Sequence, residues 1–405
     1  VSYTFEKKGE DFLPWLERKA GIEVSSSLSI GKSAHGRALF ASKFIRAGDC
    51  ILRVPYNVQL APDNLLPEIK NLLNDDIGNV AKLATVVLFE QKMGWESDWA
   101  PYVCRLPHPM EMHSTIFWSE DELELICQSS AYQETINQKS LIEKEFSAIR
   151  EAVQCSPKIF ERITFKDFMY AYALVCSRAW GSARGVSLVI ADRDYSAGEQ
   201  VMIRYGKFSN ATLLLDFGFT VPNNIHDQVR IQLNIPNHDP LCKMKLEILQ
   251  THHSAILRNI HGSNSSVDSF TIKEVRSLGG KGKGLPQPLR AFARVLCCTS
   301  PQELCDLAME AEQNDGRLAR RPLKNRSREI EAHQFLIAQI TQLVENYEAS
   351  IKSLAADSSR SVCERHALRR QMARDLLTGE LRVLKSASAW LENYCTTLST
   401  ADNIY

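Results

Sequence analysis

The chain has 405 residues, of which 44% are hydrophobic and 24% are charged. A chain of this length and composition can bury more than one core, so we expect a globular protein of two domains. The 48 Lys and Arg residues balance the 48 Asp and Glu residues, which excludes recognition of nucleic acid or an anionic membrane by overall charge. Any charge-driven recognition must come from a local patch.

The 11 cysteines are scattered, with one adjacent pair and no Cys-x-x-Cys spacing. We therefore expect reduced thiols in an intracellular or organellar compartment and no structural zinc. The longest apolar runs, such as residues 86–89, are far shorter than the roughly 20 residues that span a bilayer. Because the sequence begins at Val1 and not at Met, we expect a preceding segment, for which a transit peptide is one candidate.

The first 60 residues predict one short helix followed by short strands. The helix is expected over residues 10–20 and ends at Gly21. Strands are expected over residues 28–30, 38–42 and 50–55, separated by glycine-containing turns. This part of the chain therefore predicts a small β segment.

The rest of the chain predicts helices, a second β segment and more helices. Helical spacing of apolar residues begins at about residue 61 and continues to about residue 165. Polar and apolar residues alternate over 201–205 and 229–233, which predicts two strands. After the second strand, apolar stripes over 336–351 and 368–391 predict long antiparallel helices. This order requires two distant β segments to form one core.

A first candidate binding motif lies at residues 35–42, which read His-Gly-Arg-Ala-Leu-Phe-Ala-Ser. A glycine at the start of a strand lets main-chain groups approach a charged ligand closely. An ordinary β-turn is the alternative interpretation. The residues concerned are Gly36, Arg37 and Ala38.

A second motif lies at residues 172–180, where a predicted helix ends in Ser-Arg-Ala-Trp. The guanidinium of Arg178 could bind both oxygens of a carboxylate. The alternative is an arginine that complements the dipole at the helix C-terminus. Trp180 follows two residues later.

A third motif reads Ala-Gly-Glu-Gln-Val-Met-Ile-Arg-Tyr-Gly over residues 197–206, followed by Ser-Asn-Ala at 209–211 and Asp-Phe-Gly-Phe at 216–219. Taken in order, the three motifs resemble those of SET-domain protein methyltransferases. The resemblance is closest to the plant Rubisco large-subunit lysine methyltransferase-like family, and it covers essentially the whole chain.

The resemblance implies an α+β fold class. The expected architecture is a SET-type β fold with a helical insert, followed by an all-helical C-terminal substrate-binding domain. The SET domain would occupy residues 1–235, with the insert over about 61–165, and the substrate-binding domain would occupy residues 236–405.

The resemblance also implies a site for S-adenosyl-L-methionine and a catalytic tyrosine, Tyr205. The cofactor-binding residues would be Gly36, Arg37, Ala38, Arg178 and Tyr205, and the substrate channel would be lined by Trp180, Phe217 and Phe219. Ala38 stands where the family usually has a second glycine. Phe217 stands where the family often has tyrosine, which leaves open how many methyl groups are added.

The implied activity is N-methylation of a lysine in a non-histone protein, which the helical domain would bind. A histidine-directed relative, the actin methyltransferase, has asparagine where this chain has Trp180, so lysine is favoured over histidine. The expected compartment is the chloroplast stroma, with the mitochondrion or cytosol as alternatives. We expect no membrane partner and no nucleic acid except through an assembly, and the oligomeric state is open.

One family element, an Asn-His pair that holds the cofactor adenine, does not occur between Arg178 and Tyr205. One explanation is that a segment near Leu188 and Val189 is missing from the sequence. The other is that the protein lacks the motif and is a catalytically inactive SET-fold scaffold in a larger organellar complex. We favour the first explanation because both flanks keep the family pattern.

Two further features have simple interpretations. Residues 317–328 carry six positive charges, which is typical of a solvated loop, although docking of an acidic partner or RNA is an alternative. His226, His252 and His253 lack companions at metal-binding spacing and are expected to be surface or turn residues.

Overall fold

The computed structural model describes residues 12–400 except 34–35, 72, 74, 154–162, 182–186, 253–266 and 357–362. The chain forms two compact units, each built from several stretches of sequence. The mixed unit comprises Val1–Phe117, Ile136–Gly206 and Asp216–Gly218, and the helical unit comprises Trp118–Thr135, Lys207–Leu215 and Phe219–Tyr405. No helix within the described ranges is long and apolar enough to cross a bilayer.

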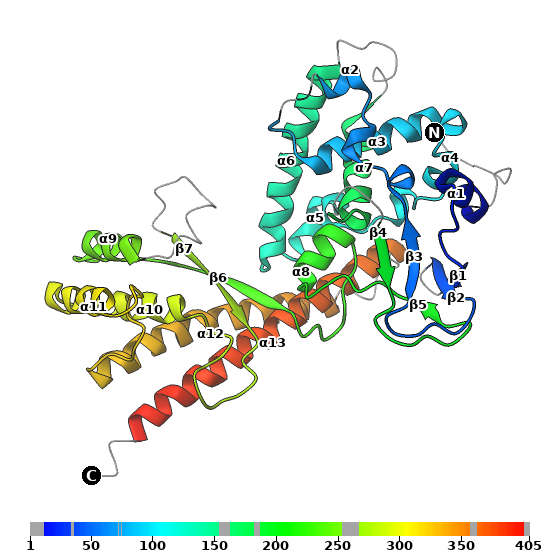
Figure 1. Cartoon of the computed structure of the whole chain (residues 1–405). Helices are drawn as coiled ribbons and strands as arrows, with labels where there is room; N and C mark the ends of the chain where they lie inside the picture. The colour runs from blue at the N-terminus through cyan, green and yellow to red at the C-terminus, as the bar shows by residue number, and fades with distance from the viewer. Residues whose placement is uncertain are drawn as a thin grey trace. The chain divides into compact units, whose positions relative to one another are not determined.

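The mixed unit contains five short strands and most of the N-terminal helices (Figure 1). Its strands are β1 (Leu28–Ser33), β2 (Gly36–Ala41), β3 (Cys50–Val54), β4 (Ser187–Ile190) and β5 (Gln200–Val201). Its α-helices are α1 (Phe12–Ala20), α2 (Pro67–Lys70), α3 (Asn79–Met93), α4 (Ala100–Val103), most of α6 (Ser130–Val153) and α7 (Phe165–Arg178). Short 3-10 helices are η1 (Tyr56–Val58), η2 (Pro62–Asn64), η3 (Gly94–Glu96), η4 (Pro109–Glu111) and η5 (Thr115–Phe117).

Strands from the two distant β segments pair with one another, as the sequence requires. Strand β2 lies between β1 and β5, and all pairs are antiparallel. Strand β3 pairs with β4, and an isolated bridge joins Ile45 to Tyr195. The side chains of Ile45, Ile51 and Tyr195 are buried in the small core that results. The prediction of one core from two β segments is therefore confirmed.

The strand expected over 201–205 is wrong in extent, because β5 ends at Val201. Met202 and Ile203 follow it with 69% and 58% of their surface exposed. Their alternating pattern is typical of a strand, but the ladder of β2 with β5 stops at the pair Leu39 and Val201. A β conformation is stabilised by pairing, so the pattern alone does not extend the strand.

The helical unit contains the C-terminal helices and one pair of strands (Figure 1). Its elements are α5 (Glu120–Glu124), α8 (Asn210–Thr212), β6 (Gln228–Asn234), α9 (Cys242–His252), β7 (Val267–Lys273), α10 (Gln287–Leu296), α11 (Pro301–Gln313), α12 (Arg326–Ala356) and α13 (Glu364–Thr400). A π-helix, η6 (Leu213–Phe217), continues from α8.

The fold class expected from the sequence is confirmed, with one difference in the C-terminal region. That region is helical but includes strand β7, which pairs antiparallel with β6 along its whole length. Val229, Ile231 and Leu233 of β6 are buried and alternate with exposed residues. The main chain of β6 needs a hydrogen-bonded partner, which β7 provides.

Helices α12 and α13 pack antiparallel within the helical unit. Arg370 near the start of α13 donates a hydrogen bond to the carbonyl of Leu354 near the end of α12, and Tyr394 near the end of α13 donates to Glu329 near the start of α12. Their buried apolar residues belong to one large core. The predicted stripes over 336–351 and 368–391 are confirmed.

A carboxyl group lies in the middle of this core. Glu380 of α13 is buried, and its Oε1 and Oε2 accept hydrogen bonds from the hydroxyls of Ser129 and Tyr347, both at 2.9 Å. Burial disfavours the carboxylate and raises the pKa of Glu380 to about 8. The side chain is therefore largely a neutral acid at pH 7.

We expect Glu380→Gln to stabilise the protein at alkaline pH. Because the folded-state pKa lies above the ordinary value of 4.5, the protonated group stabilises the fold below about pH 4.5, and this stability is lost as the pH rises through 8. One pKa unit corresponds to about 1.4 kcal/mol, so the gain in free energy of unfolding should be about 2–4 kcal/mol at pH 8 and smaller at pH 5. Urea titrations of the parent and the variant at pH 5 and pH 8 measure this gain in the free energy of unfolding. Glu345→Gln, at an exposed position of α12, is the control, and a pH-independent difference at residue 380 would contradict the prediction.

Candidate functional site

A cavity of about 520 Å³ in the mixed unit brings together four of the predicted site residues. We call it the polar cavity. The four are Arg37, Arg178, Tyr205 and Phe217. Further polar side chains in its lining are those of Tyr102, Arg105, Glu111, His113, Ser114, Ser177 and Asp216.

Helix α7 places Arg178 at the cavity. The helix begins at a capping box, in which Thr164 and Asp167 exchange hydrogen bonds between side chain and main chain. Apolar residues such as Phe168 fix its buried face. At its end, the hydroxyl of Ser177 donates to the carbonyl of Ala173 at 2.8 Å and accepts a hydrogen bond from the Arg178 guanidinium. The capped, buried helix thus carries an exposed guanidinium at its last residue.

Strand β2 places Arg37 at the same cavity. Its Nη2 donates to the carbonyl of Arg105 at 2.8 Å, just beyond α4. Ala38 is not among the residues that line the cavity. Gly36 and Ala38 pair with Ser33 and Gly31 in the β1–β2 ladder. Of the first sequence motif, the structure therefore brings the Arg37 side chain to the cavity, and the cofactor-binding roles of Gly36 and Ala38 stay predictions.

Tyr205 and Phe217 form the aromatic part of the cavity wall. Their ring centroids lie 4.9 Å apart with the planes at 75°, an edge-to-face contact. Phe217 and Asp216 end the π-helix η6, and such irregular helical turns often occur at functional sites. Tyr205 is 47% exposed, so a ligand entering the cavity can reach its hydroxyl.

Gly218 is required where the chain leaves η6. Its φ is +76°, and a Cβ there would lie 2.7 Å from the amide nitrogen of Ser114. Glycine alone permits both the left-handed conformation and this close approach. The Asp-Phe-Gly sequence therefore fixes Phe217 against the segment that carries His113 and Ser114.

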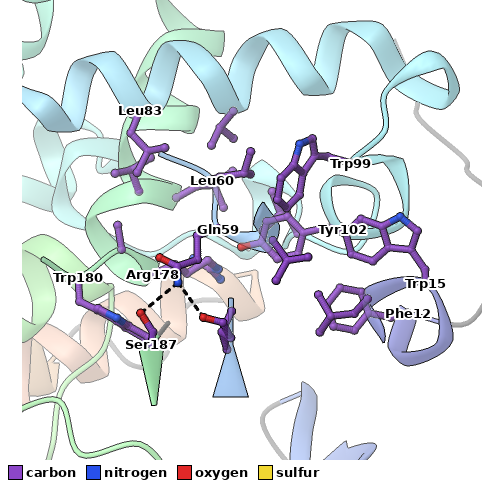
Figure 2. Close-up of a pocket in the computed structure, with 18 residues that line it drawn as sticks. Phe12, Trp15, Gln59, Leu60, Leu83, Trp99, Tyr102, Arg178, Trp180 and Ser187 are labelled. Atoms are coloured by element: carbon purple, nitrogen blue, oxygen red, sulfur yellow. Dashed lines mark hydrogen bonds between the residues drawn. The ribbon is translucent and has the colours of Figure 1, made fainter. Parts of the chain in front are cut away.

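A second cavity, of about 320 Å³, lies in the same unit (Figure 2). We call it the aromatic chamber. Phe12 and Trp15 of α1 line it together with Trp99 and Tyr102. The rings of Trp15 and Trp99 lie edge to face, with centroids 5.9 Å apart. Aliphatic residues of α3 and α7 complete the wall, among them Leu83.

Few polar groups reach the aromatic chamber. Gln59 Nε2 donates to the carbonyl of Val54 at 2.9 Å and to Ser187 Oγ at 3.2 Å, as Figure 2 shows. Arg178 lines the chamber as well as the polar cavity, as do Tyr102 and Leu106. The two cavities therefore share one wall.

Two predicted channel residues lie elsewhere. Trp180 lines the aromatic chamber and not the polar cavity, and it is 61% exposed. Phe219 belongs to the helical unit, where it is half-buried and its amide donates to the carbonyl of Leu213 at 3.4 Å. Their place in a substrate channel stays a prediction.

Several cavity residues were not found from the sequence. Asp216 could have been predicted as a cavity residue, because it directly precedes Phe217 in the third motif. Glu111 ends the short helix η4, and His113 and Ser114 lie between η4 and η5, where neither periodicity nor a motif marks them.

The charges around the polar cavity shift the pKa values of nearby groups. Burial raises the pKa of Tyr102, and the adjacent Arg178 guanidinium opposes that rise in part. Burial, together with the carboxylates of Asp216 and Glu145, raises the pKa of the Cys176 thiol to about 12. Because the thiolate is the reactive form of cysteine, Cys176 is not a nucleophile at neutral pH.

Several cations of the basic segment 317–328 lie beside carboxylates. Asp315 contacts both Arg317 and Arg320, while Arg321 lies 4.0 Å from Glu310. Arg328 pairs with Glu331 at 2.8 Å. These contacts favour the solvated-loop interpretation over an anion-binding patch.

The part of the chain that the structure describes contains no group of three or more His, Cys, Asp or Glu residues able to hold a metal ion. The ten cysteines in that part are free thiols.

Comparison with known proteins places this site in context. Residues 236–384 match a family model described as Rubisco LSMT substrate-binding. Human actin-histidine N-methyltransferase is 26% identical over 96% of this chain and 69% of its own length. The chloroplastic [fructose-bisphosphate aldolase]-lysine N-methyltransferase of Arabidopsis thaliana is 26% identical over 60% of this chain and 58% of its own length. The chloroplastic Rubisco large subunit N-methyltransferase of Pisum sativum is 27% identical over the same shares.

Solved structures of the Rubisco enzyme share the fold. The SET domain of LSMT bound to lysine and AdoHcy, and Rubisco LSMT bound to AdoMet, each superpose with a TM-score of 0.73 and 21% identity. Each match covers 96% of this chain and 92% of the other.

The fold is therefore that of a SET-domain protein. Within that class, the chain is similar to the Rubisco large-subunit methyltransferase-like proteins, which agrees with the resemblance seen in the three sequence motifs. The relatives compared above are all named as N-methyltransferases.

We expect Gly218→Ala to destabilise the mixed unit. The new Cβ would meet main chain at 2.7 Å in a left-handed conformation, so the loss should be about 1–3 kcal/mol or more. Gly198→Ala is a matched control, because Gly198 has φ +84° but nothing within 4 Å of a Cβ. Thermal unfolding should show a clearly larger drop in Tm at position 218. Equal drops would mean that the close approach to Ser114 is unimportant.

Proposed function

We propose that the protein is an S-adenosyl-L-methionine-dependent protein-lysine N-methyltransferase that acts on a non-histone protein. The observation that carries the proposal is the meeting of Arg37, Arg178 and Tyr205 in one cavity, although they come from three separate parts of the sequence. The family model at residues 236–384 supports a protein substrate. We further propose that residues 1–235 form the SET domain and residues 236–405 the substrate-binding domain.

The residues of the polar cavity fit the amino-acid part of S-adenosylmethionine. Arg37 and Arg178 present guanidinium groups suited to its carboxylate. Glu111 and Asp216 provide carboxylates suited to its ammonium group. When bound, this cofactor supplies a methyl group on a positively charged sulfonium.

The residues of the site would prepare the accepting amine. A free lysine has a pKa of about 10.4, so its proton must be lost before the nitrogen can attack. The guanidiniums of Arg37 and Arg178 disfavour a further positive charge in the cavity, and the apolar ring of Phe217 disfavours it by desolvation. The hydroxyl of Tyr205 would accept or donate a hydrogen bond that aims the nitrogen.

Histidine is the second candidate target. The actin-histidine relatives match almost the whole chain, with 96% coverage for the human enzyme, whereas the plant relatives, one of them named as a lysine N-methyltransferase, match 60%. In favour of lysine, Trp180 stands beside Arg178 where the actin enzyme has asparagine. We propose lysine and make histidine an outcome of the test.

An inactive scaffold is the rival from another class, motivated by the absence of an Asn-His pair between Arg178 and Tyr205. In the structure, β4 runs without a break through Leu188 and Val189 and pairs with β3 on both sides of that point. Arg37, Arg178 and Tyr205 nevertheless line one cavity. We therefore favour an active methyltransferase over an inactive scaffold. A chloroplast location stays a proposal, with the mitochondrion and cytosol as alternatives, because the relatives come from plants and mammals.

We expect Tyr205→Phe to lower methyl transfer about a hundredfold or more, because the hydroxyl that orients the nucleophile is lost. Purified protein would be incubated with radiolabelled S-adenosylmethionine and cell extract, and the labelled band analysed by mass spectrometry for methyllysine or methylhistidine. Cofactor affinity, measured by calorimetry, should change less than tenfold.

Tyr56→Phe is the control, since Tyr56 bonds to Asp63 outside the cavity. Undiminished labelling with Tyr205→Phe would contradict the assignment of Tyr205. No labelling by the parent protein, with no cofactor binding, would favour the scaffold.

A further inference from the structure

We propose that Asn210 and Asp227 are positioning residues for methyl transfer. They fix the two ends of residues 210–221, which we call the cavity segment. The segment contains α8 and η6, and it therefore carries Asp216 and Phe217 of the polar cavity. Neither Asn210 nor Asp227 is among the residues that line the cavity, so both would act through the residues that the segment carries. This inference rests on the proposed function.

The side chain of Asn210 joins the two ends of the cavity segment. Asn210 is completely buried. Its Oδ1 accepts a hydrogen bond from the amide of Val221 at 2.8 Å, and its Nδ2 donates to the carbonyl of Val221 at 3.0 Å. One side chain thus satisfies both main-chain groups of the residue that ends the segment. A shift of either end would leave buried polar groups without partners, which is unfavourable.

The carboxyl group of Asp227 anchors the start of the same segment. Asp227 is buried, and its Oδ1 accepts a hydrogen bond from the main-chain amide of Asn210 at 2.8 Å. Its Oδ2 accepts from Asn210 Nδ2 at 3.3 Å. The side-chain amide of Asn210 therefore uses its acceptor and both of its donor protons. A Cβ at position 379 would clash with Asp227 Oδ2, so Gly379 of α13 provides the space that the carboxyl group needs.

Three other charged or titratable groups lie around Asp227. Arg382 Nη2 of α13 is 3.8 Å from Asp227 Oδ2. Glu274, which follows β7, and Glu380 of α13 oppose a negative charge at Asp227. Burial raises the pKa of Asp227 to about 6, although the bonds from Asn210 and the guanidinium of Arg382 favour the carboxylate. Asp227 is therefore mostly ionised at pH 8 and mostly protonated at pH 5.

The protonation state of Asp227 determines how it can bind Asn210. An ionised carboxylate accepts through both oxygens, whereas a protonated one carries a hydroxyl on one of them. That proton would meet one of the two N–H donors of Asn210. The start of the cavity segment then loses a hydrogen bond, and Phe217 is held less firmly. Because a misplacement of about 1 Å can lower a rate about a hundredfold, activity should fall as the pH drops below 6.

Burial of apolar side chains is the alternative means of fixing the cavity segment. Leu213 and Leu214 are buried and hold its helical turns on the core. Such burial is not directional, so it does not determine where the two ends of the segment lie. Hydrogen bonds restrict both distance and angle, which makes them the better candidates for positioning Asp216 and Phe217.

The test compares Asp227→Asn with the parent at two pH values. The variant keeps one acceptor, but its NH2 group faces that of Asn210, as in a permanently protonated Asp227. Initial rates of transfer from radiolabelled S-adenosylmethionine to the labelled band of a cell extract would be measured at pH 8 and pH 5. Dividing the variant's rate by the parent's cancels effects of pH on the target. We expect a ratio of about one tenth or less at pH 8, rising several-fold at pH 5.

Two variants control for loss of stability and for a neighbouring titration. Asp239→Asn weakens the buried ion pair of Asp239 with Lys245 in the same unit, so it should lower the Tm while its rate ratio stays near one at both pH values. His226 precedes Asp227, and histidine side chains titrate in this pH range. His226→Gln should therefore keep the pH dependence of the parent.

Two further measurements do not depend on the fold tolerating Asp227→Asn. Arg382→Gln changes a partly exposed side chain and removes the nearest positive charge, so it should move the acid limb of activity to higher pH by about half a pH unit or more. Hydrogen exchange in a peptide that contains Val221 reports on the Asn210 bond directly. Its protection should be about fivefold lower in Asp227→Asn than in the parent at pH 8.

The outcomes separate this inference from the proposed function. If the parent transfers methyl groups but the ratio for Asp227→Asn is the same at both pH values, the positioning role is wrong and the methyltransferase proposal stands. Equal losses of activity in Asp227→Asn and Asp239→Asn would also overturn it, because reduced stability would then explain both. If the parent labels no protein at either pH, both proposals fail.

Discussion

The mixed unit depends on the pairing of strands that are more than 130 residues apart in the sequence. Strand β2 takes β5 as its neighbour, β3 takes β4, and Ile45 bridges to Tyr195. Closing so long a loop costs conformational entropy, which burial of the small core must offset. Because Tyr205 follows β5 by four residues, this pairing also determines where the proposed catalytic residue enters the unit.

The site is assembled from elements of different kinds, each with its own local constraint. The strand β2 delivers Arg37, a capped helix delivers Arg178, and a π-helix closed by Gly218 delivers Phe217. Only the last requires an unusual backbone, with φ +76° and a main-chain contact that excludes a Cβ. Three arginines and two acidic residues, Glu111 and Asp216, then share one cavity. This mixture suits a zwitterion better than a simple anion.

The sequence predicted the architecture better than the site. Short strands around 28–55 and the stripes of α12 and α13 follow from periodicity, because burial of one face produces the pattern. Strand β7 and the end of β5 depend on which main chain is available as a partner, and periodicity does not contain that information. Motifs located Arg178, Tyr205 and Phe217, but nothing in the sequence marks Trp99 as a neighbour of Trp15.

Arg178 lies at the wall that the two cavities share, in a chain that has no Asn-His pair between Arg178 and Tyr205. Arg178 is exposed on both sides of that wall, so it can hold a charged group in one cavity and border an aromatic one in the other. Guanidinium groups are suited to both contacts, since they pair with carboxylates and stack on rings. A lysine could serve the first contact only. The identity of residue 178 therefore matters more than its charge, because two cavities of different chemistry meet at this side chain.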